Sequence, residues 1–350
     1  LLRIISAVSL SFFVLIYISA QIDATGSAFE AFLQWDYHAG ALVGFFIVAG
    51  YCIAGGFLAA AWTDMFQGGV MLFCLLALPI VASLSIENFE SIYAGLETID
   101  PGLVNMWGAG GINTLNVSIV LGMALIGLGF LGSPQVFARL IAIKSKIEIR
   151  RGRWVALLFT IIVDFSAVSI GILGRYIFAE QGTDPEAFLG NGAQNVLSEM
   201  VEYTFPAWVV GLYVAAVLAA IMSTVSSLLV MASSSLTYDL YARIYNPNMG
   251  DNQATRLCRR ITVLMALAAL CISMTVAFLS PERTIFWFAV FGWSGIGATF
   301  CPMILLSLFW PKFTERAAIA SMLTGFLVTL ISKFFLQKID GVGDYIAALE

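Results

Sequence analysis

The sequence has 350 residues, of which 60% are hydrophobic and only 11% are charged, and its mean hydropathy is +0.92. This composition excludes a soluble globular domain, in which about 25% of residues are charged, and indicates an integral membrane protein. The net charge is −5, and the single histidine, His38, excludes both a histidine metal cluster and a Ser-His-Asp triad. We therefore expect neither enzymatic chemistry nor a bound cofactor.

Nine apolar segments are each long enough to cross the hydrocarbon core of a bilayer, which takes about 20 helical residues. In chain order they are residues 3–21, 39–60, 64–86, 115–136, 154–176, 207–236, 260–280, 285–310 and 316–336. Strands of a membrane barrel would instead alternate in polarity over about 10 residues. The sequence therefore predicts an all-α, multi-pass membrane protein with about nine spans.

The connections between these spans alternate in charge along the chain. Three of them, residues 22–38, 87–114 and 177–206, contain acidic residues and neither lysine nor arginine. The opposite side carries 13 of the 17 basic residues, namely Arg3, Arg139, Lys144, Lys146, Arg150, Arg151, Arg153, Arg243, Arg256, Arg259, Arg260, Lys312 and Arg316. By the positive-inside rule the basic side is cytoplasmic. We therefore predict a protein of the cell (inner) membrane whose first end lies inside.

Glycine and proline are expected to interrupt three of the spans. They are Pro79 in the third span, Gly127, Gly129, Gly132 and Pro134 in the fourth, and Gly292, Gly295, Gly297 and Pro302 in the eighth. Backbone groups freed in this way are tolerated at membrane depth only beside protein or a water-filled cavity. Broken helices form the midplane sites of secondary transporters. The alternative is a packing kink without a ligand, which we prefer for Pro79.

The sixth span contains a run of small and hydroxyl residues, Ala219-Ala220-Ile221-Met222-Ser223-Thr224-Val225-Ser226-Ser227. One interpretation is close packing between helices, where small residues are common. The other is a cation site, because sodium is a hard ion that binds hydroxyl and carbonyl oxygens. The residues alone leave both interpretations open.

Two aspartates are further candidates for function. Asp164 is the one ionisable residue well inside a predicted span, where it is either functional or paired with a group on a neighbouring helix. Asp64 lies near the start of the third span, where a carboxylate can cap the first helical turn. Thr63, Asp64 and Gln67 also share one helix face. An inner exit pathway lined by this face is the alternative to capping.

Three separate motifs follow one another along the chain. They are Gly55-Gly56-Phe57-Leu58-Ala59 with Trp62-Thr63-Asp64 and Gln67, then Leu128-Gly129-Phe130-Leu131-Gly132-Ser133-Pro134 with Arg139, then Ala219-Ala220-Ile221-Met222-Ser223-Thr224 with Leu236-Thr237-Tyr238-Asp239-Leu240-Tyr241. In this order, and with this topology, they resemble the sodium/solute symporter family, and within it the bacterial sodium/proline symporters. The resemblance extends over nearly the whole chain.

The resemblance implies a transporter core of ten helices in two inverted five-helix repeats, of the leucine-transporter type. On this basis residues 1–350 form one transporter domain that holds core helices three to ten and one more, with the first core helices and the C-terminal end missing. The resemblance also implies a sodium ion held by the carbonyl of Ala220 and the hydroxyls of Ser223 and Thr224. Its other ligands would lie on the first core helix.

The resemblance also assigns a substrate pocket. Tyr17, Phe130 and Pro134 match pocket positions, and Asp64 matches an aspartate linked to sodium use, with Gln67 beside it on the inner pathway. Proline symporters have tryptophan at the position of Ile126 and tyrosine at that of Phe130. This chain therefore lacks two hydrogen-bond donors there. The expected solute is an amino acid such as proline or a related carboxylate, with proline itself in doubt.

We therefore predict a sodium-coupled symporter of a small organic solute that works by alternating access. Its partners are Na⁺, the solute and the lipid bilayer, with no nucleic acid and no oligomeric state specified. One alternative is a membrane sensor module fused to a signalling domain, which sequence beyond Glu350 would reveal. The other is a channel, which saturable, sodium-dependent uptake would exclude.

Overall fold

The computed structural model of the chain describes residues 1–86, 89–178 and 184–349, with the backbone alone described at residues 53–60 and 89. The side chains of the motif at residues 55–59 therefore lie outside the described part. The described residues are helical and form no strand. The helices of 20 residues or more are α1 (Leu2–Leu33), α2 (Tyr37–Leu84), α7 (Lys146–Phe178), α10 (Ala207–Ser234), α11 (Asp251–Leu279), α12 (Ile285–Phe309) and α13 (Glu315–Phe334).

Shorter helices lie between these long ones. They are α3 (Phe89–Ile99), α4 (Thr114–Ile126), α5 (Gly129–Gly132), α6 (Pro134–Ile141), α8 (Pro185–Leu189), α9 (Val196–Thr204) and α14 (Gly343–Leu349), with the 3₁₀ turns η1 (Pro101–Val104), η2 (Asn191–Ala193) and η4 (Leu336–Lys338). The segment η3 (Ser235–Tyr245) continues α10 as a π-helix.

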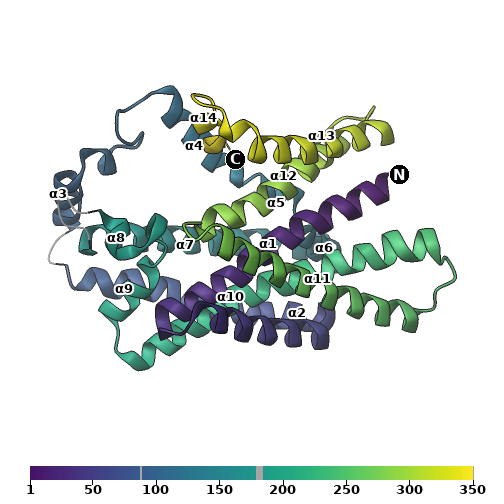
Figure 1. The fold of residues 1–350 in the computed structure, drawn as a ribbon, viewed down its shortest axis with the longest axis horizontal. Coiled ribbons are helices and arrows are strands. Elements are labelled where there is room, and N and C mark those ends of the chain that lie inside the picture. The colour runs from purple at the N-terminus through teal and green to yellow at the C-terminus, as the bar shows by residue number, and fades with distance from the viewer. Residues whose placement is uncertain (87–88, 179–183, 350) are drawn as a thin grey trace.

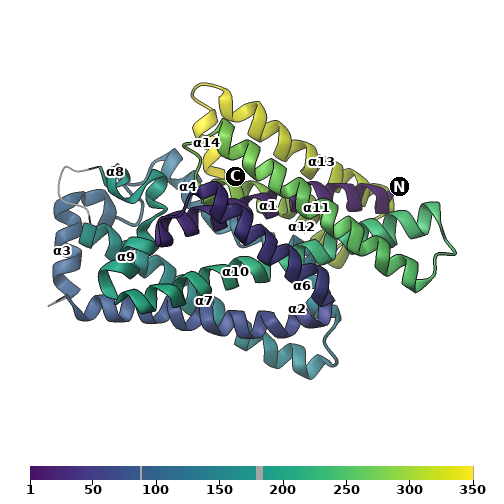
Figure 2. The same cartoon turned by 60° about the horizontal axis from the view of Figure 1, so that its bottom comes forward.

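Helix α1 runs through the middle of the bundle. It packs against α2, α10, α11 and α12, as Figures 1 and 2 show. Helices α3, α8 and α9 lie together at one end of the molecule, whereas the N-terminus and the connection from η3 to α11 lie at the opposite end (Figures 1 and 2). The chain therefore crosses repeatedly between two ends, as a multi-pass membrane protein does.

Eight stretches of the described chain are long and apolar enough to cross a membrane. They are Leu2–Leu33, Ala61–Leu84, Thr114–Gly132, Lys146–Phe178, Ala207–Tyr245, Asp251–Leu279, Ile285–Phe309 and Glu315–Lys338. Each overlaps one predicted span. The remaining predicted span, residues 39–60, overlaps the shorter apolar stretch Tyr37–Cys52. The predicted all-α, multi-pass architecture is confirmed.

Some predicted boundaries are wrong. The connection predicted at residues 22–38 is helical as far as Leu33, and α1 ends only at Gln34, whose φ of 55° lies in the left-handed region. The interruption predicted in the eighth span at Pro302 is also wrong, because α12 is continuous through this residue, and α2 is continuous through Pro79, where we expect only a packing kink. One proline removes a single helical hydrogen bond and bends a helix, and packing against neighbours can hold such a helix together.

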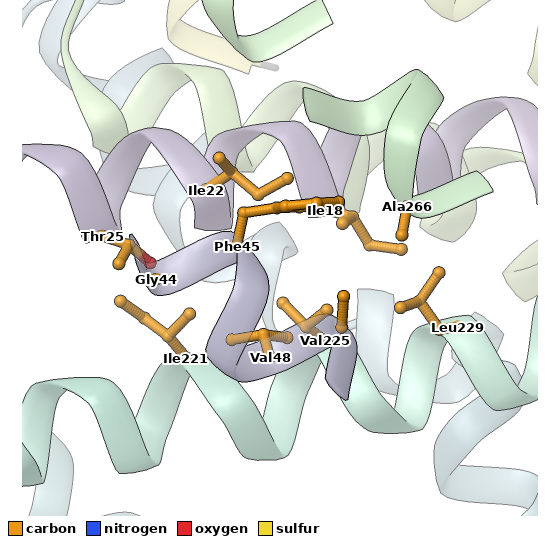
Figure 3. A pocket seen from close by; sticks show the side chains of 11 residues that line it. Ile18, Ile22, Thr25, Gly44, Phe45, Val48, Ile221, Val225, Leu229 and Ala266 are labelled. Carbon is orange, nitrogen blue, oxygen red and sulfur yellow. The ribbon is translucent and has the colours of Figure 1, made fainter. Parts of the chain in front are cut away.

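The two faces of α10 have different roles. Ile221, Val225 and Leu229 recur every four residues and pack with α1, α2 and α11 around an apolar void of about 10 Å³ (Figure 3). A void this small holds no more than about one water molecule, so this face is well packed. Ser223 and Thr224 lie on the other face of the same helix, because a helix turns about 100° per residue. Packing on the apolar face therefore fixes the direction of the hydroxyl face.

The outside of α7 is mostly apolar, with Asp164 as an exposed charged residue. Leu157, Leu158, Ile161 and Phe165 are between 49% and 73% exposed. A row of this kind is unusual on a soluble protein, whereas hydrocarbon tails solvate it without cost. This surface therefore fits a bilayer.

Candidate functional site

The fourth predicted span is broken in the structure, as its glycines and proline predict. Helix α4 ends at Ile126, α5 is one turn at Gly129–Gly132, and α6 begins at Pro134. Ser133, between α5 and α6, has an extended backbone with φ −80° and ψ 111°. Proline suits the first turn of a helix because the N–H that it lacks has no helical partner there. The break leaves backbone carbonyls at the end of α4 open to partners outside the helix.

A cavity of about 570 Å³ lies beside this break. Its lining includes six of the predicted site residues, which are Tyr17, Asp64, Ile126, Phe130, Ser223 and Thr224. Side chains from α1, α2, α4, α5, α10 and α12 thus meet at one place, although they are spread over most of the sequence. The volume is in the range of sites that bind small organic molecules.

Three oxygen atoms of α10 lie together, and two of them belong to Ser223 and Thr224 at the wall of this cavity. Ser223 Oγ and Thr224 Oγ1 donate hydrogen bonds to the carbonyl oxygen of Ala220, at 3.0 and 3.1 Å. A helical hydroxyl commonly bonds to the carbonyl three or four residues before it, and its own lone pairs then remain available. Carbonyl and hydroxyl oxygens are the ligands that hard cations prefer. The chemistry and the spacing of these three groups therefore fit Na⁺.

Asp64 and Arg139 form an ion pair at the border of the cavity. Arg139 Nη2 donates to Asp64 Oδ2, and the same Nη2 also donates to Ser227 Oγ at 2.6 Å. Asp64 lies well inside α2, so the predicted capping role is wrong. Within the described part of the chain, Asp64 Oδ1, Gln67 Oε1 and Gln135 Oε1 are buried and accept no hydrogen bond. The cluster therefore holds unused oxygen acceptors next to the cavity.

An aromatic group forms another part of the wall. The ring of Trp293, on α12, lies edge-on to Phe130 at a centroid distance of 4.8 Å and to Tyr17 at 6.0 Å. Its indole Nε1 donates to the carbonyl oxygen of Ile126 at 3.0 Å. Analysis of the sequence missed Trp293. The available signal was a large aromatic residue within the glycine-rich stretch 292–297.

Four predicted site residues, Ala220, Gln67, Pro134 and Asp164, do not line the cavity. Pro134 starts α6 and Gln67 is one turn beyond Asp64 on α2. Asp164 lies on an exposed part of α7, and it has no hydrogen-bond or ion-pair partner among the described residues. The geometry therefore separates Asp164 from the site.

A second ion pair lies away from the cavity and was also missed. Asp23 is fully buried on α1, and Arg283 Nε donates to its Oδ2 at 3.0 Å while Nη2 donates to Oδ1. The hydroxyl of Tyr37, at the start of α2, donates to the same Oδ1 at 2.5 Å. Burial lowers the pKa of Arg283, but the hydrogen bonds and the charge of Asp23 outweigh it, so this pKa is raised and the guanidinium stays charged. The sequence pattern does not reveal this pair, because it predicts a connection at Asp23.

This architecture is shared with a known family of proteins. The model of the family described as "Sodium:solute symporter family" matches residues 1–325. The chain is 32% identical over 352 residues to the high-affinity proline transporter PutP of Bacillus subtilis (strain 168), covering 97% of this chain and 70% of that protein. It is 30% identical over 336 residues to the sodium/proline symporter of Escherichia coli (strain K12), covering 96% of this chain and 64% of that protein.

A solved structure has the same fold. It is described as the substrate-bound, outward-open state of a Na⁺-coupled sialic acid symporter, and it matches with a TM-score of 0.68 over 94% of this chain and 74% of that chain. The two chains are 17% identical, so the likeness concerns the fold. It confirms the predicted leucine-transporter-type arrangement of helices. The chain thus spans about two thirds of the length of the proteins it resembles.

Proposed function

Because the chain belongs to the sodium:solute symporter family, we propose that it forms the transport core of a sodium-coupled symporter for a small organic solute. One observation carries the proposal. Oxygen atoms suited to Na⁺ and an aromatic wall suited to an organic solute line the same cavity, beside a broken helix. In secondary transporters, broken helices supply the backbone groups and the open space that such a site needs.

In this proposal Na⁺ binds to α10. The carbonyl of Ala220 and the hydroxyls of Ser223 and Thr224 contribute three oxygens, and both hydroxyls already lie within 3.1 Å of the carbonyl oxygen through their hydrogen bonds. Coordination would exchange those hydrogen bonds for bonds to the ion. Asp64 and Gln67, with unused carboxylate and amide oxygens, then form the next polar step on the inner pathway.

The solute is placed against the aromatic wall. Tyr17, Phe130 and Trp293 form this wall with Ile126 beside them, and the side chains of Ile126 and Phe130 offer no hydrogen-bond donor. The relatives described above are named as proline transporters, which supports an amino acid or a related carboxylate as the solute class. The apolar groups at positions 126 and 130 favour a broader or more hydrophobic solute than proline.

Coupling follows if the two ligands prefer the same conformation. A ligand shifts a conformational equilibrium only by its differential affinity for the two states. We propose that Na⁺ on α10 stabilises the outward-open state and completes the solute pocket, so that each ligand raises the affinity for the other. The sodium gradient then drives solute entry by alternating access.

The proposal includes an orientation in the membrane. The N-terminus and the connection from η3 to α11 lie at the same end of the molecule (Figures 1 and 2); Arg3 lies near the first, and Arg243 and Arg256 flank the second. By the positive-inside rule we assign this end to the cytoplasm, in the cell (inner) membrane, and treat residues 1–350 as one transporter domain.

Uptake by the purified protein in liposomes tests the proposal. A panel of labelled solutes that contains proline, other aliphatic amino acids and small carboxylates is offered under an inward Na⁺ gradient. We expect saturable uptake of at least one of them, which stops when Na⁺ is replaced by K⁺ or when an ionophore removes the gradient. Flux that neither saturates nor depends on Na⁺ would contradict symport and support a channel.

A further inference from the structure

One side chain from another helix forms a hydrogen bond at the helix break. Trp293, on α12, donates from its indole Nε1 to the carbonyl oxygen of Ile126 at 3.0 Å, across 167 positions of sequence. Ile126 is the last residue of α4. A carbonyl at that position has no partner within its own helix. Trp293 therefore satisfies a backbone group that the break leaves open.

The same ring holds the aromatic wall in place. Its edge-on contacts with Phe130 and Tyr17 have the perpendicular geometry that aromatic pairs favour. Trp293 and Ile126 also line a second cavity, of about 550 Å³, on the other side of this contact. The two residues thus form the partition between the solute cavity and its neighbour.

This arrangement requires a glycine on α5. A Cβ at Gly129 would overlap the indole Nε1 of Trp293. A Cβ at Gly297, one turn further along α12, would lie 3.1 Å from the Cα of Gly129, which is closer than most side chains tolerate. The indole reaches the Ile126 carbonyl because residue 129 has no side chain.

We propose that Trp293 is a positioning residue that sets solute selectivity, an inference that rests on the function proposed above. Its N–H donates to the Ile126 carbonyl and its ring holds Phe130, so the part of the wall formed by Ile126, Phe130 and Trp293, away from the Tyr17 hydroxyl, presents apolar surface. The wall selects solutes whose apolar part, an aliphatic ring or chain, lies against it. A solute with a hydroxyl at that end is rejected, because the hydroxyl would lose its hydrogen bonds to water and find no partner.

Two variants test the inference from opposite sides. Trp293→Phe keeps an aromatic ring but removes the N–H, which frees the Ile126 carbonyl to accept from a solute hydroxyl. Gly129→Ala keeps the tryptophan and displaces its indole. The matched control is Trp287→Phe, the same substitution on the same helix at a residue that lines neither cavity. If the Trp293→Phe protein does not accumulate in the membrane, Gly129→Ala tests the inference by itself.

The measurement is competition of Na⁺-driven uptake by an accepted solute and by its hydroxylated analogue, for example proline and 4-hydroxyproline. In both test variants we expect the ratio of the two inhibition constants to shift by about tenfold toward the hydroxylated analogue, the scale of one hydrogen bond. The control should keep the wild-type ratio. The sodium concentration for half-maximal uptake should stay at the wild-type value in all three variants.

Failure of this inference can be distinguished from failure of the proposed function. An active Trp293→Phe or Gly129→Ala variant with the ratio of Trp287→Phe overturns the inference and leaves the proposed function intact. Equal loss of affinity for both solutes also overturns it, because that pattern indicates a merely structural role. Absence of Na⁺-driven uptake by the wild type overturns the proposed function, and this inference with it.

Discussion

The two ion pairs of the described chain differ in how completely their atoms are used. Asp23 has both carboxylate oxygens bonded, to Arg283 and Tyr37, and the Arg283 side chain is only 16% exposed. Asp64 has one bonded and one unbonded oxygen, and its partner Arg139 is 48% exposed. A fully partnered pair has a fixed geometry. A partly partnered pair beside a cavity is able to exchange partners, so we interpret the first as a brace and the second as part of the transport pathway.

The surroundings of the two pairs support this distinction. The Asp23 cluster joins α1, where Asp23 is fully buried, to the start of α2 and to the connection before α12. The Asp64 cluster joins α2, α6 and α10 at the border of the cavity that also contains Ser223 and Thr224. We therefore propose that the same chemistry, an aspartate with an arginine, serves stability in one place and binding in the other.

The largest expected effect is on the brace. Asp23→Asn leaves the Arg283 charge buried without its counter-charge, which should lower the free energy of unfolding by about 3–5 kcal/mol. The measurement is thermal unfolding of the purified protein in detergent, with Glu30→Gln, an exposed residue of the same helix, as control. Replacing both partners, as Asp23→Leu with Arg283→Leu, should recover most of the loss. An Asp23→Asn variant as stable as the control would show that the cluster is not a brace.

The next effect concerns the Asp64–Arg139 pair and is measured in transport. Asp64→Asn should raise the sodium concentration for half-maximal uptake by about tenfold, the usual size of a coupling between sites. The free energy of unfolding should change by less than about 1 kcal/mol, because the Arg139 side chain of this pair is 48% exposed and an exposed ion pair is weak. Asp164→Asn is the matched control, since that residue is exposed on α7 and lines neither cavity. If Asp164→Asn had the larger effect on sodium use, the functional interpretation of that residue would replace this assignment.

A third expected effect, of similar size, concerns the wall next to the Asp64–Arg139 pair. The double variant Ile126→Trp with Phe130→Tyr restores two donors, and it should shift preference toward proline by about 1–3 kcal/mol, roughly 5- to 150-fold. Competition of uptake by unlabelled solutes, in wild type and double variant, measures this shift. High-affinity proline uptake by the wild type that is unchanged in the double variant would show that these positions do not set specificity.

Features that depend on local pattern were predictable from the sequence. Apolar length predicts the helical spans, and the glycines and Pro134 predict the break between α4 and α6. The hydroxyls of Ser223 and Thr224 share a helical turn with Ala220, so their proximity follows from helix geometry alone.

Features that depend on contacts between distant segments were not predictable. Arg283 lies 260 positions after Asp23, and a charge that is cancelled by so distant a partner makes its segment look like a loop. Asp64 looked like a helix cap because its partner Arg139 is 75 positions away. Trp293 belongs to no recognised motif. Its role depends on a hydrogen bond to the carbonyl at a break in another helix, which the local sequence does not indicate. Periodicity reports which face of a helix is buried and says nothing about which partner it meets.

The sodium activation curve tests the central claim most directly. Uptake is measured against Na⁺ concentration for Ser223→Ala and Thr224→Ala, with Ser233→Ala, a fully buried serine on the same helix, as control. Each test variant removes one hard oxygen from the proposed site, so the half-maximal sodium concentration should rise by about tenfold or more, while thermal stability stays close to that of the control. Wild-type sodium curves in both variants would contradict the cation site and leave helix packing as the role of these hydroxyls.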